Sequence, residues 1–123
     1  MLNEEKMKAL NFQLLNQNLM SLKNQLNTID LQIADLTNLK MGLFELKDIK
    51  DTKTFVPFGN GLFLEATLKQ PENVLMNVGS NVLVKKNIEA TDKILKKQIF
   101  DLNSIHSQLN NEIEKMENAL FGF

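Results

Sequence analysis

Few residues of this sequence could carry out catalysis or hold a metal. The 123 residues include no cysteine and one histidine, His106, which excludes disulfides, thiol catalysis, cysteine zinc sites and paired-histidine metal sites. The Gly59-Asn60-Gly61 turn lies in no G-x-x-x-x-G-K-[ST] phosphate loop. The carboxylates Glu112, Glu114 and Glu117 spread around a helical period without a nucleophile beside them. We therefore expect no enzyme, no cofactor and no bound metal.

The side chains that remain are suited to contacts with other proteins. Methionine and phenylalanine form adaptable, non-directional apolar contacts, and they gather with leucine near the two ends of the chain. The candidate surface, called the tip below, consists of Met7, Leu10, Phe12, Leu14, Met116, Leu120, Phe121 and Phe123. A second interpretation stays open, in which Phe12, Met116 and Leu120 end an internal helix seam and Phe121 and Phe123 are frayed.

Charge and hydropathy exclude several other classes of protein. The net charge is −1, and every cation is a lysine, whereas nucleic-acid binders carry a basic stripe rich in arginine. No apolar run approaches the 18 or so residues that span a membrane, and the acidic start of the sequence differs from a secretory signal. We expect a cytoplasmic protein that binds neither nucleic acid nor membrane.

A long helix that positions the first tip residues is predicted over about 3–50. Apolar side chains recur with alternating steps of three and four, which is the heptad pattern of a coiled coil; they are Phe12, Leu15, Leu19, Leu22, Leu26, Ile29, Ile33 and Leu36. The pattern then slips by one three-residue step, which predicts that the seam continues through Leu39, Leu43 and Leu46. Asn3 is the expected N-cap.

A second helix is predicted over 87–121, with Asn87 as its N-cap. Its seam contains Ile99, Leu102, His106, Leu109, Ile113, Met116 and Leu120. If the two helices pair antiparallel with Leu46 beside Ile88, Leu120 falls near Leu14 and about ten N-terminal residues extend past the partner helix. His106 at a seam position either fixes the register beside a polar neighbour or acts as a pH switch.

Both prolines and three of the five glycines lie in the central segment 52–86. Short β-type runs flank Asn60-Gly61 and Gly79-Ser80-Asn81, which predicts two hairpins. Isolated hairpins are marginal in water and leave edges open, so we expect them to associate with other subunits. The expected oligomerisation residues are Val56, Phe58, Leu62, Phe63, Leu64, Val74, Met76, Val78, Val82 and Val84.

The order helix, two hairpins, helix resembles prefoldin, and the second hairpin resembles the archaeal α class. The most telling stretches are Val56-Pro57-Phe58-Gly59-Asn60-Gly61-Leu62-Phe63 and Val78-Gly79-Ser80-Asn81-Val82-Leu83-Val84-Lys85-Lys86-Asn87. The resemblance implies an α+β fold, in which a long antiparallel two-helix coiled coil carries two β-hairpins that form an intersubunit β-barrel. Residues 1–123 would then be one prefoldin-like domain.

The same resemblance implies a function and partners. Two α and four β subunits would form a hexamer that holds unfolded client proteins at its tips without ATP and passes them to a group II chaperonin. Two alternatives from other classes stay open. The first is a structural filament assembled through the hairpins, and the second is a coiled-coil scaffold that binds a partner helix along its seam.

Overall fold

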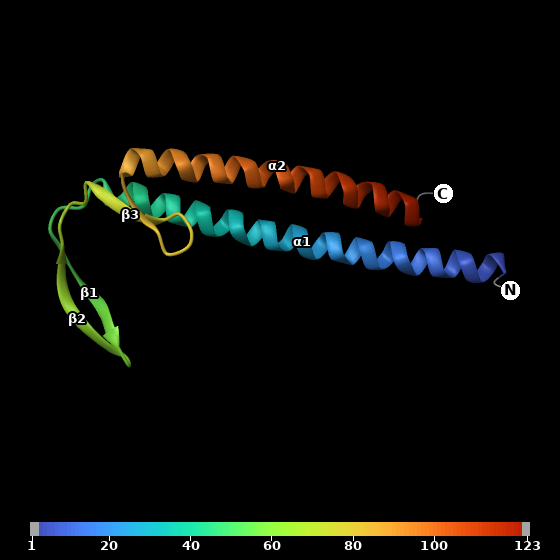
Figure 1. Cartoon of the computed structure of the whole chain (residues 1–123), viewed down its shortest axis with the longest axis horizontal. Coiled ribbons are helices and arrows are strands. Elements are labelled where there is room, and N and C mark those ends of the chain that lie inside the picture. Colours follow the sequence, from blue (N-terminus) through green and yellow to red (C-terminus); the bar gives the residue numbers. More distant parts are fainter. Residues whose placement is uncertain (1–2, 122–123) are drawn as a thin grey trace. The chain divides into compact units, whose positions relative to one another are not determined.

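The computed structural model describes residues 3–121, which form two long helices and two β-hairpins (Figure 1). Their order is α1 (Glu4–Leu46), β1 (Thr52–Gly59), β2 (Leu62–Leu68), β3 (Asn73–Asn77), β4 (Leu83–Asn87) and α2 (Ile88–Phe121). The chain divides into two compact units. The terminal unit contains the residues up to Asp35 and those from Ile99 onward, and the hairpin unit contains Leu36–Gln98. The single-domain expectation stays a prediction.

Both helices begin at the predicted caps. The Lys6 N–H donates to Asn3 Oδ1 over 2.9 Å, and the Ala90 N–H donates to Asn87 Oδ1 over 2.7 Å. Helix α1 ends at Leu46, four residues before the predicted end. There the backbone tightens into bonds three residues apart, from Lys47 N–H to Phe44 O and from Asp48 N–H to Glu45 O, which stops α-helical propagation.

In the terminal unit, α1 and α2 pack antiparallel along the predicted seam. Leu19, Ile113 and Leu120 form its buried cluster, and Leu15, Leu22, Leu26 and Met116 pack against it. Leu120 thus belongs to the same cluster as Leu15 and Leu19, and Leu15 directly follows the predicted neighbour Leu14. An exposed ion pair, Lys23 Nζ to Glu117 Oε1 at 3.4 Å, also joins the helices.

In the hairpin unit, α1 and α2 pack around a second cluster of Leu43, Ile88 and Leu95. The predicted slip to Leu39 is wrong, because Leu39 is 57% exposed and the unbroken heptad position is taken by the half-buried Lys40. A lysine can bury its aliphatic stem there while its ammonium group reaches water. The change of phase comes later, between Leu43 and Leu46.

The two hairpins are separate antiparallel two-stranded sheets, β1–β2 and β3–β4. Gly59 pairs with Leu62, so Asn60 and Gly61 form a two-residue turn, and both have positive φ, 48° and 78°. This is the predicted type I′ turn. In the second hairpin the Val78 N–H donates to Val82 O over 3.0 Å around Gly79-Ser80-Asn81.

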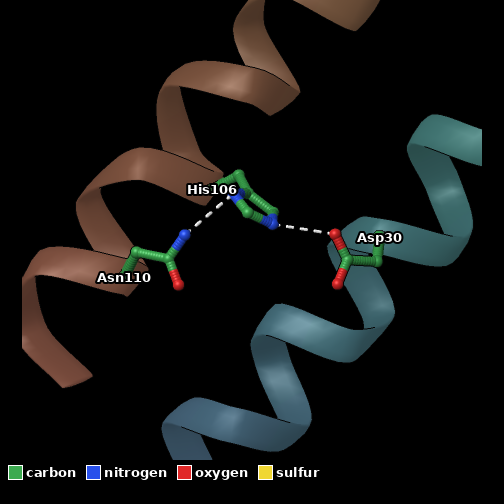
Figure 2. A network of polar contacts seen from close by, with 3 residues as sticks. All are labelled: Asp30, His106 and Asn110. Atoms are coloured by element: carbon green, nitrogen blue, oxygen red, sulfur yellow. Dashed lines mark hydrogen bonds and ion pairs between the residues drawn. The ribbon is translucent and has the colours of Figure 1, made fainter. Parts of the chain in front are cut away.

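His106 lies in the seam of the terminal unit and contacts a polar group on the other helix. Figure 2 shows its ring between Asp30 of α1 and Asn110 of α2, with Nε2 2.8 Å from Asp30 Oδ1 and Nδ1 3.2 Å from Asn110 Nδ2. If the Asn110 amide donates to Nδ1, Nε2 carries the proton and donates to Asp30. A polar seam residue with one partner favours one register, which agrees with the first interpretation of His106.

Replacement of His106 by leucine tests whether this polar contact fixes the register of the helices at a cost in the free energy of unfolding. We expect His106→Leu to raise the free energy of unfolding by about 1 kcal/mol, because an apolar side chain replaces a half-buried polar one while Asp30 stays in water. Urea unfolding followed by circular dichroism measures it. Asn110→Ala is the control, with a change below about 0.5 kcal/mol. A less stable His106→Leu chain would show that the bond to Asp30 outweighs the added burial.

Leu120 and Phe121 are adjacent in sequence and differ sharply in burial, at 3% and 69% exposed. We expect Leu120→Ala to lower the free energy of unfolding by about 2–4 kcal/mol, because it leaves a cavity in the seam. Phe121→Ala should change it by less than about 0.5 kcal/mol. Thermal and urea unfolding of the two variants checks this, and equal losses would contradict the assigned seam.

Candidate functional site

The N-terminal part of α1 extends beyond the seam of the terminal unit. The first half-buried side chain of the helix is Leu15, and every residue from Glu4 to Leu14 is exposed. The stretch carries four large apolar side chains that are at least half exposed, Met7, Leu10, Phe12 and Leu14. Since no seam partner among residues 3–121 covers them, they form an apolar surface suited to contact with another molecule.

The spacing of these side chains gives the surface its form. Met7, Leu10 and Leu14 follow one another by three and four residues, so they line one face of the helix. Phe12 continues the seam stripe of Leu15 and Leu19 beyond the point where α2 covers it. Glu4 and Glu5 in the first turn suit the positive end of the helix dipole.

The rest of the predicted tip is divided between surface and core. Phe121 is exposed, whereas Leu120 is buried and Met116 packs against the buried cluster. Leu120 and Met116 are therefore covered within the seam, as the second interpretation had it, whereas Phe12 lies on the seam stripe but is exposed. Phe123 lies outside the described residues. The exposed tip surface is accordingly Met7, Leu10, Phe12, Leu14 and Phe121, and its role in binding stays a prediction.

Hairpin β1–β2 exposes apolar side chains on both faces. Val56 pairs with Leu64 on one face, and Pro57 pairs with Phe63 on the other. All of the predicted oligomerisation residues in this hairpin are exposed, as are Phe55 and Leu68, which the prediction omitted. The sequence signal available for Phe55 and Leu68 is the period-two alternation of each with a neighbouring threonine, Thr54 and Thr67. A hairpin bare on both faces is a surface that favours association.

Hairpin β3–β4 differs, because one of its faces packs within the same chain. Val74, Met76 and Val84 are half-buried, and Val74 contacts the Leu43, Ile88 and Leu95 cluster. These three predicted oligomerisation residues are thus partly used inside the hairpin unit. The outer face carries Leu75 and Leu83, both exposed and both missed from the sequence, and Val78 and Val82 are exposed around the turn. Their role in joining subunits stays a prediction.

Groups suited to catalysis are dispersed over the described residues. Among residues 3–121, no three histidine, aspartate or glutamate side chains converge into a possible metal site. The described helices also include none that is long and apolar enough to cross a membrane. The apolar surfaces of α1 and of the hairpins are therefore the candidate functional features.

Comparison with known proteins identifies the family. The family model described as "Prefoldin subunit" matches residues 15–120. A protein of Methanococcus maripaludis named prefoldin subunit alpha is 31% identical over 98 residues, covering 80% of this chain and 67% of that protein. A protein of the same name from Thermofilum pendens is 25% identical over 96 residues, covering 77% of this chain and 74% of that protein.

A solved structure shares the fold. It is a cryo-EM structure of filamentous PFD from Methanocaldococcus jannaschii, which superposes with a TM-score of 0.76 at 20% identity. The match covers 88% of this chain and 90% of that one. The solved neighbour thus shares the fold of this chain, whose order helix, two hairpins, helix is the one predicted from the sequence. The chain belongs to the prefoldin family, a family of chaperones rather than enzymes, and resembles its archaeal α subunits.

Proposed function

We propose that this chain is the α subunit of a cytoplasmic, ATP-independent holdase. In this proposal it captures unfolded polypeptides with the exposed tip surface and passes them to a group II chaperonin. The observation that carries the proposal is the stretch of α1 from Glu4 to Leu14, whose apolar side chains extend beyond the seam without a partner.

Capture by such a surface needs no chemical energy. Burial of apolar area is favourable by about 25 cal/mol per Å², and it is non-directional, so one surface suits clients of many sequences. Met7 adapts its shape through its flexible thioether chain, and Phe12 and Phe121 offer large contact areas. Contacts of this kind are also reversible, which a transfer step requires.

Assembly multiplies the weak grip of a single tip. We propose that the hairpins join two α and four β subunits through β-barrels, as the family resemblance implies. Several tips on one complex then bind one unfolded chain at high effective concentration, so that avidity exceeds the affinity of any single tip. The exposed faces of β1–β2 support this role, because they carry apolar side chains that the hairpin itself cannot cover.

A filament is the second candidate function. The solved neighbour is a filamentous assembly, and among residues 3–121 the two hairpins remain separate sheets. Heterologous contacts that do not close a ring continue as fibres. In that case the chain would be a structural protein, and its tip surface would be incidental.

Removal of the exposed tip side chains tests the holdase. We expect the triple variant Met7→Ser, Leu10→Ser, Phe121→Ser to lose suppression of client aggregation, because apolar contact area is removed where no internal partner exists. Light scattering of a chemically denatured client diluted into the assembled complex measures the effect. The subunit composition and helicity should match the unsubstituted complex.

A matched control exists on the same two helices. Met20→Ser, Leu31→Ser, Phe100→Ser removes the same three residue types from the terminal unit, and all six side chains are between 51% and 69% exposed. This control should retain suppression. If the tip variant still suppresses aggregation, or if both variants lose activity equally, the tip is not the binding site.

The mass of the assembly separates the two candidate functions. We expect the chain mixed with a single-hairpin prefoldin β subunit to form one closed complex, measured by native mass spectrometry and by light scattering after size exclusion. The chain alone should form smaller species. Long homopolymers from the chain alone would favour the filament, and a monomer in both samples would rule out assembly through the hairpins.

A further inference from the structure

The turn at the end of hairpin β1–β2 places a chemically labile side chain next to an unhindered backbone nitrogen. Asn60 is the one asparagine of the sequence that glycine follows. Asn60 and Gly61 are both exposed, and both have positive φ. Asparagine is a thermolabile residue, because the backbone nitrogen of the residue that follows can attack its side-chain amide carbon. The turn therefore combines the two groups that this reaction needs.

The backbone nitrogen of Gly61 is accessible to the reaction. Among the hydrogen bonds between residues 3–121, none involves the Gly61 N–H, and none holds the side-chain amide of Asn60. Gly61 has no side chain to shield its nitrogen, and a Cβ at its position would meet nothing within 4 Å. Water or hydroxide can therefore remove the proton of the Gly61 N–H, while the Asn60 side chain is free to rotate towards that nitrogen.

The backbone around the turn can yield as the ring closes. Closure requires the peptide group between Asn60 and Gly61 to rotate out of its position in the type I′ turn. Glycine stands on both sides of Asn60, in open space, and glycine tolerates such rotation at little steric cost. The pairing is also irregular between Pro57 and Gly59, so the ladder is locally disrupted beside the turn. The turn can thus open while the rest of the hairpin stays paired.

The turn of hairpin β3–β4 is an internal comparison, because its asparagines are exposed but lack the same chemistry. Asn81 also has positive φ, 61°. Its successor Val82 is β-branched and crowds its own nitrogen, and the Val82 N–H donates to Gly79 O over 2.9 Å. Asn77 Oδ1 accepts a hydrogen bond from the Gly79 N–H over 2.9 Å, which holds that side chain in place. Only Asn60 combines a free amide with a free, unhindered nitrogen.

We infer that Asn60 is a site of spontaneous deamidation in the folded chain, with water as the co-reactant. The deprotonated nitrogen of Gly61 attacks Asn60 Cγ, forms an N–Cγ bond and displaces the side-chain amide group as ammonia. Water then opens the resulting succinimide ring. Cleavage of the bond from nitrogen to Cγ leaves aspartate, and cleavage of the bond from nitrogen to the main-chain carbonyl carbon leaves isoaspartate. Nothing is oxidised or reduced, and no enzyme is required.

The two products change the hairpin in different ways. Aspartate keeps the turn, because Asp-Gly also forms type I′ turns, and it adds a negative charge beside the exposed apolar side chains of Phe58 and Leu62. In isoaspartate the main chain runs through Cγ and is one carbon atom longer. The turn between Gly59 and Leu62 then no longer matches the ladder that a two-residue loop closes. Deamidation therefore alters the first hairpin as the protein ages, with or without a client or a second subunit.

Peptide mapping of the incubated chain tests the site. The folded chain is kept in mildly alkaline buffer and digested; mass spectrometry then detects the amide-to-acid mass gain at each asparagine, and an isoaspartyl methyltransferase labels isoaspartate. We expect conversion at Asn60 to exceed conversion at Asn81 by about tenfold or more, since a β-branched residue follows Asn81. Conversion should rise with pH, because the Gly61 N–H must lose its proton. Equal conversion at the two asparagines, or conversion of Asn60 only in urea, overturns the inference.

Two variants separate the modification from the loss of the asparagine itself. Asn60→Gly keeps the turn, because Gly-Gly suits type I′, but it has no amide to lose; Asn60→Asp carries the added charge from the start. Hydrogen exchange of β1–β2 is compared before and after incubation. We expect faster exchange in the incubated unsubstituted chain, no change in incubated Asn60→Gly, and normal exchange in fresh Asn60→Asp. If incubation leaves exchange unchanged although Asn60 has converted to isoaspartate, or speeds it equally in Asn60→Gly, the inferred effect on the turn is wrong.

Discussion

The seam between α1 and α2 is the interaction on which the rest of the structure depends, because two helices can cover each other along only one narrow stripe. All of the buried hydrophobic side chains in the described chain belong to this seam, and none is completely inaccessible; they are Leu19, Leu43, Ile88, Leu95, Leu109, Ile113 and Leu120. A stripe of this width leaves many large apolar side chains exposed to water. Exposed apolar surface is thus a direct result of the architecture.

The hairpins modify this constraint in two different ways. Hairpin β3–β4 packs Val74 onto the Leu43, Ile88 and Leu95 cluster, which gives the hairpin unit a third layer and a wider core. Hairpin β1–β2 adds nothing to that core, since every residue of β1 and every residue of β2 except Ala66 is exposed. The contrast indicates that the first hairpin contributes mainly to contacts outside the chain.

Local chemistry made much of the fold predictable from sequence. The heptad steps from Leu15 to Leu36, the caps at Asn3 and Asn87 and the Asn60-Gly61 turn each depend on neighbouring residues, and each is found as expected. The family resemblance rested on the same segments. The tip was foreseen in part, because the helix lengths alone imply that α1 extends past α2.

What could not be predicted depends on contacts between distant segments. An alternative seam through Leu39 had better hydrophobicity than one through Lys40, but the geometry of two regular helices favoured the lysine. Period-two alternation showed that Val74 and Met76 share a face without showing that this face meets the helices of the same chain. Leu120 and Phe121 are equally apolar in the sequence, and only their angular positions on α2 separate core from surface.

The antiparallel seam also has a consequence for the order of folding. Leu43 and Ile88 are joined by a much shorter stretch of chain than Leu19 and Leu120, although both pairs belong to the same seam. Loop closure costs more entropy as the loop lengthens, and contacts between near segments form sooner. Hairpin formation shortens the effective loop further. Pairing would then start next to the hairpins and advance towards the chain ends, so the last contacts to form, and the first to open, are those beside the tip.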